Sequence, residues 1–297
     1  MKHLTDEEWK LLSDLISEHF GLVFPTTRRA LLEHRLRARL ERLHLNTFAE
    51  YYRFLVCHPE RHTELRELPM LITNNETYFF REAHQFRLLT KHLLPELSPR
   101  FRARPLRILS AGCSSGDEVY SIVISLYEWS DNLAGGNWLV DACDLNRQRL
   151  VQAREAVYEP NHLRACDEVM RSTYFDQREG RFALRKKFLT GTRFFELNLA
   201  SATMEFPGAP YDIIFCRNVL IYFSNPAFDA LITRFHEALA DHGFLFLGHA
   251  ESLIGRRDDF RPVRYQGSIV YEKRARDRVG TEAAPPPQSH RGGSGTL

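Results

Sequence analysis

The spacing of apolar residues changes along the chain and predicts two kinds of domain. In the first 100 residues apolar positions recur at helical spacing, and Thr5 followed by three acidic residues is typical of a capped helix start. Further helices are predicted over residues 27–43 and 46–56. From Leu106 onward, short apolar runs such as LRILSA, WLVDAC, YDIIFC and FLFLG alternate with helical segments. This alternation is typical of a parallel sheet covered by helices.

These patterns divide the chain into regions. Residues 1–95 are predicted to form an all-helical domain, and residues 96–273 a domain built on the parallel sheet. Within the second domain, residues 175–189 alternate in polarity around a central turn, which predicts a hairpin in a small antiparallel β-subdomain over about residues 158–192. Residues 274–297 have too few apolar side chains to form a core, and we expect a disordered tail there.

Composition narrows the classes of protein. With 297 residues, 43% of them hydrophobic and 26% charged, the chain can bury the core of one large or two modest domains, which excludes a fibrous or wholly disordered protein. A net charge of +2 gives no overall attraction to nucleic acid or to a membrane. The five cysteines are widely spaced, and no apolar stretch approaches the roughly 18 residues of a membrane span. We therefore expect a cytoplasmic protein with free thiols and no bound metal.

A glycine-bearing loop after the first predicted strand is the candidate ligand site. Gly112 and Gly116 let the backbone approach a ligand closely, but their spacing matches neither the dinucleotide fingerprint nor a phosphate-binding loop. Asp117 and Glu118 open the next helix, where acidic groups repel a pyrophosphate. Asp144 ends the second predicted strand, a place where a carboxylate typically binds ribose hydroxyls. The combination favours S-adenosylmethionine, although an ordinary helix cap explains the loop and its acidic residues equally well.

Two more segments carry polar side chains where ligands bind in such sheets. Arg217 and Asn218 directly follow the apolar run YDIIFC. Upstream, residues 72–82 read ITNNETYFFRE, in which three consecutive aromatic residues stand beside amide, hydroxyl and guanidinium groups. An amphipathic helix explains the aromatic residues, but it does not explain polar groups that recur at each strand end. These segments therefore favour a ligand crevice over a helix cap.

Together the motifs carry a family resemblance. The strings NNETYFFRE, SAGCSSGDEVYS, DACDLN and IIFCRNVLIYF, followed by GFLFLGHAESL, resemble those of CheR-type chemotaxis receptor methyltransferases over about residues 5–273. The resemblance implies an α/β fold: a class I, Rossmann-like S-adenosylmethionine-dependent methyltransferase domain with an N-terminal all-helical domain and a small antiparallel β-subdomain. Besides Gly112, it implies cofactor contacts at Asn75, Thr77, Arg81, Glu118, Asp144, Asn198, Leu199, Arg217 and Asn218. The implied product is S-adenosylhomocysteine.

The implied reaction, methylation of receptor glutamates, needs no general base. A glutamate with a pKa of about 4.3 is already ionised near neutral pH, so the enzyme has to align the reactants and exclude water. Arg81 and Tyr222 are the candidates for alignment, because a guanidinium holds a carboxylate through two hydrogen bonds and a phenol hydroxyl orients lone pairs. Tyr222 also fits an ordinary core aromatic residue. His249 is expected to be structural or at the surface.

A basic helix is the candidate docking surface. On a helical wheel over residues 27–43, four leucines form one face and four arginines lie on its flank. The arginines are Arg28, Arg35, Arg39 and Arg42. A solvated face explains such a stripe, but the resemblance implies a glutamate-bearing receptor coiled coil as partner and favours docking. We expect methyl-accepting chemoreceptor cytoplasmic domains as partners, with no nucleic acid, since no aromatic platform accompanies the stripe, and no direct membrane insertion.

The hypothesis is a protein-glutamate O-methyltransferase of chemosensory adaptation. Two alternatives stay open: carboxyl methylation of another signalling protein, and a non-catalytic cofactor-binding adaptor. Some members of the family grip a C-terminal receptor pentapeptide through a Gly-rich insertion in the hairpin loop, whereas residues 176–180 here read DQREG with no extra segment. Capture of a peptide at a sheet edge needs a loop shaped around the peptide ends. We therefore expect docking that is independent of such a pentapeptide.

Overall fold

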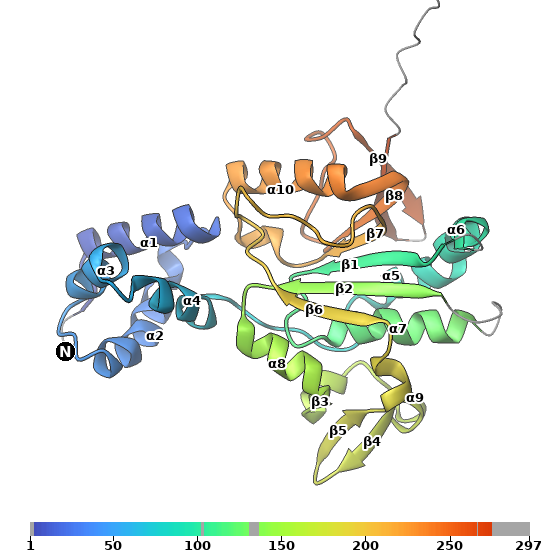
Figure 1. Cartoon of the computed structure of the whole chain (residues 1–297), viewed down its shortest axis with the longest axis horizontal. Helices are drawn as coiled ribbons and strands as arrows, with labels where there is room; N and C mark the ends of the chain where they lie inside the picture. Colours follow the sequence, from blue (N-terminus) through green and yellow to red (C-terminus); the bar gives the residue numbers. More distant parts are fainter. Residues whose placement is uncertain (1–2, 102–103, 131–136, 266, 275–297) are drawn as a thin grey trace, which may run out of the picture.

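The computed structural model describes residues 3–101, 104–130, 137–265 and 267–274. In Figure 1 a bundle of helices at one end is joined to a larger domain built around a central sheet, from which a small β-subdomain projects. Within the described ranges, no helix combines the length and apolar character needed to cross a bilayer. Apart from Arg274, the tail that we expect to be disordered lies outside the described residues.

The helical domain begins with the capped start that the sequence predicts. The Glu8 amide donates to the Thr5 hydroxyl and the Thr5 amide donates to the Glu8 carboxylate, so two free amides at the helix start find acceptors. The helices of this domain are α1 (Asp6–Phe20), the 3-10 turn η1 (Thr26–Arg28), α2 (Arg29–Arg42), α3 (Phe48–Cys57) and α4 (Arg61–Ile72). All four α-helices contribute to one apolar core. The helices predicted over residues 27–43 and 46–56 are confirmed as α2 and α3.

A seven-stranded sheet forms the centre of the second domain. Its strands are β1 (Leu106–Ala111), β2 (Trp138–Asp144), β6 (Thr192–Glu196), β7 (Tyr211–Cys216), β8 (Leu239–Leu247), β9 (Phe260–Tyr265) and β10 (Ser268–Lys273). They stand in the order β6-β2-β1-β7-β8-β10-β9; the first five are parallel, and β10 runs antiparallel to both of its neighbours. The predicted parallel sheet is confirmed, with the four apolar runs as β1, β2, β7 and β8. The antiparallel pair has no counterpart in the prediction.

Alternate residues of the strands face opposite sides of the sheet, which gives this domain two cores. One core includes Ile108 and Phe215, and the other includes their neighbours Leu109 and Ile214. The helical elements that cover the first core are α5 (Ala83–Leu88), the π-helical turn η2 (Leu89–Leu93), α6 (Leu94–Phe101), α7 (Asp117–Ser130) and α8 (Arg147–Glu155). Helix α10 (Asn225–Ala238) covers the second core.

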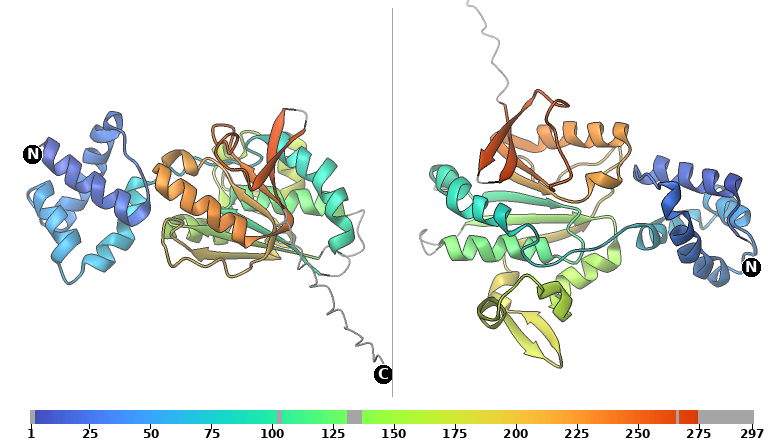
Figure 2. Two further views of the ribbon diagram at one scale, coloured as in Figure 1. Left: turned by 90° about the horizontal axis from the view of Figure 1, so that it is seen from above. Right: turned by 180° about the vertical axis from the view of Figure 1, so that it is seen from behind.

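The boundary between the helical core and the sheet differs from the domain boundary predicted at residue 95. Apolar side chains from Phe79 to Leu97 lie in a core of the sheet, whereas the helices of the first domain end their shared core at Ile72. The predicted boundary places α5 and η2 with the helical domain, whereas they pack on the sheet, because helical spacing identifies a buried face but not the surface that buries it. Figure 2 shows the linking segment after α4 running from the helical bundle to the sheet domain.

The long connection between β2 and β6 contains the small β-subdomain. Its strands β3 (Val157–Tyr158), β4 (Phe175–Arg178) and β5 (Arg181–Leu184) pair antiparallel in the order β3-β5-β4. The short helices around them are η3 (Pro160–Leu163), α9 (Glu168–Tyr174) and η4 (Lys186–Leu189). Glu179 and Gly180 join β4 to β5 with φ of 48° and 79°, the positive values that two-residue hairpin turns favour. The predicted hairpin is confirmed, and it projects from the domain in Figure 1.

Residues 21–24, which we call the strap, tie the helical domain to the sheet domain. Two backbone hydrogen bonds form an antiparallel bridge between Leu22 and Phe223: the Val23 amide donates to the Tyr222 carbonyl at 2.7 Å, and the Ser224 amide donates to the Gly21 carbonyl at 2.9 Å. Gly21 has a φ of 68°, and a Cβ there would lie 2.8 Å from the Cβ of Ala200. Both the backbone conformation and the close approach therefore require glycine.

Candidate active site

A cleft opens at the carboxyl ends of β1, β2 and β7, and the strap forms part of its wall. All the residues predicted to contact a cofactor line it: Asn75, Thr77, Arg81, Gly112, Glu118, Asp144, Asn198, Leu199, Arg217 and Asn218. Tyr222 and Arg28 line it as well. Parallel strands bring these distant residues together because their carboxyl ends meet at one edge of the sheet.

The loop after β1 is held against β2 by its own backbone. The amides of Gly112 and Cys113 both donate to the Cys143 carbonyl, at 2.8 and 2.9 Å. Gly112 has a φ of 81°, and a Cβ there would clash with Cγ2 of Val219. Glycine at this position therefore lets the loop after β7 pack directly on the loop after β1.

Asp144 ends β2 at the cleft. Its carboxylate accepts hydrogen bonds from the Ser114 amide at 2.8 Å and from the Asn146 amide at 2.7 Å. Burial raises the pKa of the Asp144 carboxyl, and the backbone hydrogen bonds act in the opposite direction. A carboxylate has about four acceptor positions, so Asp144 retains acceptors for hydroxyl groups such as those of a ribose.

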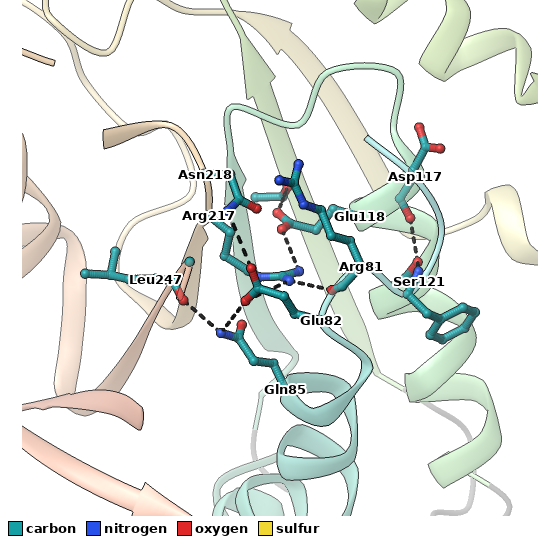
Figure 3. A network of polar contacts seen from close by, with 12 residues as sticks. Arg81, Glu82, Gln85, Asp117, Glu118, Ser121, Arg217, Asn218 and Leu247 are labelled. Carbon is teal, nitrogen blue, oxygen red and sulfur yellow. Dashed lines mark hydrogen bonds and ion pairs between the residues drawn. The ribbon is translucent and has the colours of Figure 1, made fainter. Parts of the chain in front are cut away.

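Arg217 lies between two carboxylates beside the cleft, as Figure 3 shows. Its side chain is only 2% exposed, with Nη1 3.2 Å from the Glu118 carboxylate and Nη2 3.4 Å from that of Glu82. Nη2 also donates to the Arg81 carbonyl. Burial raises the pKa of the Glu118 carboxyl, while the charge of Arg217 lowers it. Two carboxylates against one guanidinium leave one negative charge in excess, which suits a cationic ligand.

Glu82 fixes the side chain of Asn218 and is absent from the predicted site. Both residues have a positive φ, 58° and 59°, and Nδ2 of Asn218 lies 3.4 Å from Oε1 of Glu82. Gln85 and His249 contact the same carboxylate, at 3.1 and 3.0 Å. Glu82 is the last residue of the string NNETYFFRE. Nothing in its spacing indicates that it turns back to the loop after β7, and only its position in that motif could have drawn attention to it.

Arg81 and Tyr222 reach the cleft from different elements. Nη1 of Arg81 donates to the Glu76 carbonyl at 2.8 Å, and the guanidinium lies over the Tyr78 ring, 5.9 Å from its centroid. The Tyr222 hydroxyl accepts a hydrogen bond from Nδ2 of Asn74 at 3.0 Å. In the described part of the chain no side-chain carboxylate pairs with Arg81. Its guanidinium therefore has donors left for an anionic ligand.

Tyr222 is half-buried, packs against the core of the helical domain and lies under a guanidinium. The guanidinium carbon of Arg28 is 5.1 Å from the centroid of the Tyr222 ring. Arg28 thus belongs to the cleft wall, where its positive charge adds to that of Arg81. Elsewhere in the lining of the cleft, Nδ2 of Asn198 donates to the His19 carbonyl at 2.7 Å. The helical domain therefore contacts the cleft at two places.

The other three arginines predicted as a docking stripe have different surroundings. Arg39 pairs with Glu64 through both carboxylate oxygens, with Nε 2.7 Å from Oε1, and the two side chains are 12% and 3% exposed. The Tyr51 hydroxyl donates to the same carboxylate at 2.7 Å. Arg39 thus holds α2 against α4, and its role in docking stays a prediction. A helical wheel gives the direction of a side chain but not the carboxylate on α4 that faces it.

Arg35 contacts the end of α4, whereas Arg42 faces solvent. Nη1 of Arg35 donates to the carbonyls of Leu71 and Thr73, at 2.7 and 3.3 Å, and so satisfies acceptors at the end of α4. Arg42 is exposed. The stripe therefore separates into a cleft residue, two residues that bind α4 and one exposed residue.

The groups around the cleft fit S-adenosylmethionine. Asp144 provides acceptors for hydroxyls, and the carboxylate pair around Arg217 provides the excess negative charge that a sulfonium and an amino group favour. Over the residues that the structure describes, no three His, Cys, Asp or Glu side chains come together as a metal site. The expectation that no metal is bound concerns the whole chain and stays a prediction.

The fold and this cleft define a class I S-adenosylmethionine-dependent methyltransferase. The features that define this class are the parallel sheet whose strand β10 runs antiparallel to its neighbours, and the acidic residues Glu118, after β1, and Asp144, at the end of β2. The chain belongs to the CheR methyltransferase family. Residues 75–269 match the "CheR methyltransferase, SAM binding domain", and residues 7–68 match the "CheR methyltransferase, all-alpha domain". The gap between the two matches coincides with the end of the helical core at Ile72.

Similar proteins extend over most of the chain. The chemotaxis protein methyltransferase of Salmonella typhimurium is 33% identical over 272 residues, which cover 90% of each chain. That of Escherichia coli is 34% identical over 276 residues, which cover 90% of this chain and 91% of the relative. Among solved structures, TrmN from Thermus thermophilus is 20% identical with a TM-score of 0.37, covering 62% of this chain and 48% of that chain.

Proposed function

We propose that this chain transfers a methyl group from S-adenosylmethionine to glutamate side chains of chemoreceptor cytoplasmic domains, giving glutamate methyl esters for chemosensory adaptation. The observation that carries the proposal is that one cleft combines acidic groups suited to the cofactor with Arg81 and Tyr222, which suit a carboxylate. The similarity to chemotaxis protein methyltransferases supports the receptor as substrate. The presence of both aligning residues favours an enzyme over a cofactor-binding adaptor.

In this proposal different residues of the cleft bind different parts of S-adenosylmethionine. Asp144 accepts hydrogen bonds from the ribose hydroxyls, and Glu118 with Arg217 faces the charged end of the cofactor. Asn198 and Leu199 contribute from the loop after β6. Bound S-adenosylmethionine supplies a methyl group activated by a positively charged sulfur. The strap covers this part of the cleft and limits the access of water.

Arg81 and Tyr222 then hold the substrate glutamate, which is already ionised. Arg81 donates to the carboxylate from its free guanidinium hydrogens. The Tyr222 oxygen already accepts from Asn74, so its own proton is available for donation to the carboxylate. The negative charge of the glutamate disappears as the ester forms. Arg81 therefore has to align the carboxylate, but it must not bind the ionised substrate more tightly than the transition state, because that would slow the reaction.

Transfer of a labelled methyl group tests the proposal. The full-length chain is incubated with S-adenosylmethionine carrying the label and with fragments of receptor cytoplasmic domains. We expect label on the receptor that is released by base, as a carboxyl ester is. Base-stable label, or label only on another signalling protein, would reject the glutamate or the receptor as substrate. Cofactor binding without any transfer would favour the adaptor.

We further propose that docking does not depend on a C-terminal receptor pentapeptide. Strand β4 forms one edge of the small sheet, but the connection from β4 to β5 consists of Glu179 and Gly180 alone. A loop of this length has no segment that closes around the ends of a bound peptide. Methylation of a receptor with and without its last five residues should proceed at similar rates. A large loss on truncation, or micromolar binding of the free pentapeptide, would contradict this.

A further inference from the structure

Glu251, in the loop after β8, binds five backbone amides with one carboxylate. The residue is 7% exposed and carries no positively charged side-chain partner among its described contacts. Its Oε1 accepts from the amides of Val219 at 2.9 Å, Leu220 at 2.7 Å and Ile221 at 3.3 Å, and its Oε2 accepts from those of Asn218 at 2.9 Å and Gly248 at 2.6 Å. Four of these five amides belong to the loop after β7, which carries cleft residues at both of its ends.

The conformation of that loop explains why it needs an acceptor. Asn218 is left-handed, with a φ of 59°, and Val219 is right-handed, with φ and ψ of −113° and −47°. A left-handed residue next to a right-handed one turns successive amides to the same side and forms a concavity for an anion. The short 3-10 turn that follows, η5 (Leu220–Tyr222), has no side-chain cap at its start. Glu251 occupies this concavity from the neighbouring loop.

Close packing fixes the two loops against each other. A Cβ on Gly248 would lie 2.7 Å from Nδ2 of Asn218 and 2.9 Å from Oε2 of Glu251, so no side chain fits between them. Glu82 contacts Asn218 from the other side. The Asn218 side chain is therefore held between two carboxylate-bearing segments that are distant in sequence.

We propose that Glu251 is a positioning residue for the cleft. Its carboxylate holds the loop of residues 217–222 in the conformation in which Asn218 faces the cofactor side and Tyr222 faces the substrate side. Glu251 itself does not line the cleft. The proposal rests on the proposed function for the roles of these two residues, and it adds the group that sets their positions.

The Glu251→Gln variant tests the proposal, with Glu272→Gln as the matched control. Gln keeps the size of the side chain but turns an amide donor toward amide donors, so part of the set of five bonds is lost. Glu272 is 8% exposed on β10 and accepts from Arg261 and His242, away from the cleft. For Glu251→Gln we expect at least 10-fold weaker binding of S-adenosylhomocysteine by calorimetry and at least 10-fold lower kcat, with the receptor KM within about 2-fold.

Hydrogen exchange provides a readout that does not depend on activity. The amides of residues 218–221 should exchange at least 10-fold faster in Glu251→Gln and at the wild-type rate in Glu272→Gln. If a folded Glu251→Gln keeps wild-type exchange at these amides, or keeps wild-type affinity and kcat, the proposal is wrong. If the variant does not fold, Gly248→Ala disturbs the same contact between Asn218 and Glu251, and the same outcomes decide.

The two proposals fail in different ways. If the wild-type chain does not methylate receptor glutamates, the proposed function falls, while the exchange and S-adenosylhomocysteine measurements still decide the role of Glu251. If methylation is normal and the Glu251→Gln variant behaves like the Glu272→Gln control, only the positioning role falls.

Discussion

Charged side chains at the cleft differ in whether they already have a partner. Arg217 is enclosed by Glu118 and Glu82, so its charge is already paired. Arg81 and Arg28, in contrast, lie over aromatic rings, and the described residues include no carboxylate paired with either. A paired charge holds the site together, whereas an unpaired guanidinium can bind an incoming anion. The substrate-facing chemistry is therefore expected at Arg81 and Arg28.

Replacement of Arg81 should separate turnover from cofactor binding. We expect Arg81→Ala to lower kcat by about 100-fold, because misalignment of reacting groups costs on that order. The affinity for S-adenosylhomocysteine should change far less. Arg164→Ala is the control, since Arg164 lies over the same Tyr78 ring, 3.6 Å from its centroid, but does not line the cleft. Near wild-type kcat at saturating cofactor would remove Arg81 from the aligning role.

Cofactor affinity should fall in mild acid. In the proposed function, ribose hydroxyls donate to the ionised form of Asp144, so affinity should be constant above the pKa of this carboxyl and should decrease as the pH falls below it. Burial raises the pKa values of Asp144 and Glu118, so the decrease should begin at a higher pH than for an exposed carboxyl, whose pKa is about 4. Calorimetry with S-adenosylhomocysteine at several pH values measures this.

The variant Asp144→Asn identifies the carboxyl responsible. It should weaken binding about 10-fold or more at neutral pH, the loss expected for charge-assisted hydrogen bonds, and should reduce the change in affinity with pH. Asp141→Asn is the control, because Asp141 is buried on the same strand but pairs with Arg193 outside the cleft. Unchanged affinity in folded Asp144→Asn would exclude Asp144 from the site.

At the scale of elements, α2 has both a structural and an exposed side. Leu32, Leu36 and Leu40 lie in the core, and Arg39 reaches across to α4. Arg42 extends into solvent near the end of the helix. Substitutions along this one basic stripe should therefore differ in effect: a change at Arg39 should lower stability, whereas a change at Arg42 should weaken receptor docking.

Two variants of α2 test this division. Arg39→Ala leaves the buried Glu64 without its positively charged partner, and we expect a loss of about 3 to 5 kcal/mol in the free energy of unfolding. Arg42→Glu should leave stability unchanged and raise the receptor KM, with an effect that shrinks as salt rises. Denaturant unfolding and kinetics at two salt concentrations measure both. A receptor KM that is unaffected by Arg42→Glu would leave this end of α2 as a solvated face.

What the sequence could predict depends on how local each signal is. Strand β1, the capping box at Thr5 and the turn at Glu179 are determined within a few residues, and the pattern identifies them. Gly112, Asp144 and Arg217 follow from their positions at strand ends, whereas Asn75 and Asn198 come only from the family resemblance. Contacts such as Arg39 with Glu64, or Glu251 with the loop after β7, join segments far apart in the chain and have no periodic signal. The packing of α5 on the sheet has no periodic signal for the same reason.

At the scale of the whole molecule, the two domains share one cleft. The strap pairs with residues 222–224, and Asn198 bonds to the end of α1. Phe20 and Arg28 line the cleft from the helical domain. Binding of a cofactor between these walls should therefore stabilise the contact between the domains as well as each domain.

A change at Gly21 should disturb this contact. Gly21→Ala forces a side chain into a left-handed conformation and against Ala200, and we expect a loss of about 1 to 3 kcal/mol in stability with weaker S-adenosylhomocysteine binding. Gly180→Ala is the control, because Gly180 has a φ of 79° but a Cβ there meets nothing within 4 Å. The Gly180→Ala variant should lower stability without changing the affinity for S-adenosylhomocysteine. Equal affinities in the two variants would show that the strap does not shape the cleft.

The shared cleft also limits how this enzyme can be recombined with its relatives. A hybrid that joins the helical domain of one relative to the sheet domain of another exchanges α2, which we expect to dock receptors, but it also replaces Arg28 and the strap that borders the cleft. Mismatched side chains where the strap contacts the sheet domain would weaken catalysis, even if every residue of the sheet domain were unchanged. A redesign of receptor choice should therefore alter only the outer surface of α2 around Arg42 and retain residues 20–28 with the sheet domain they contact.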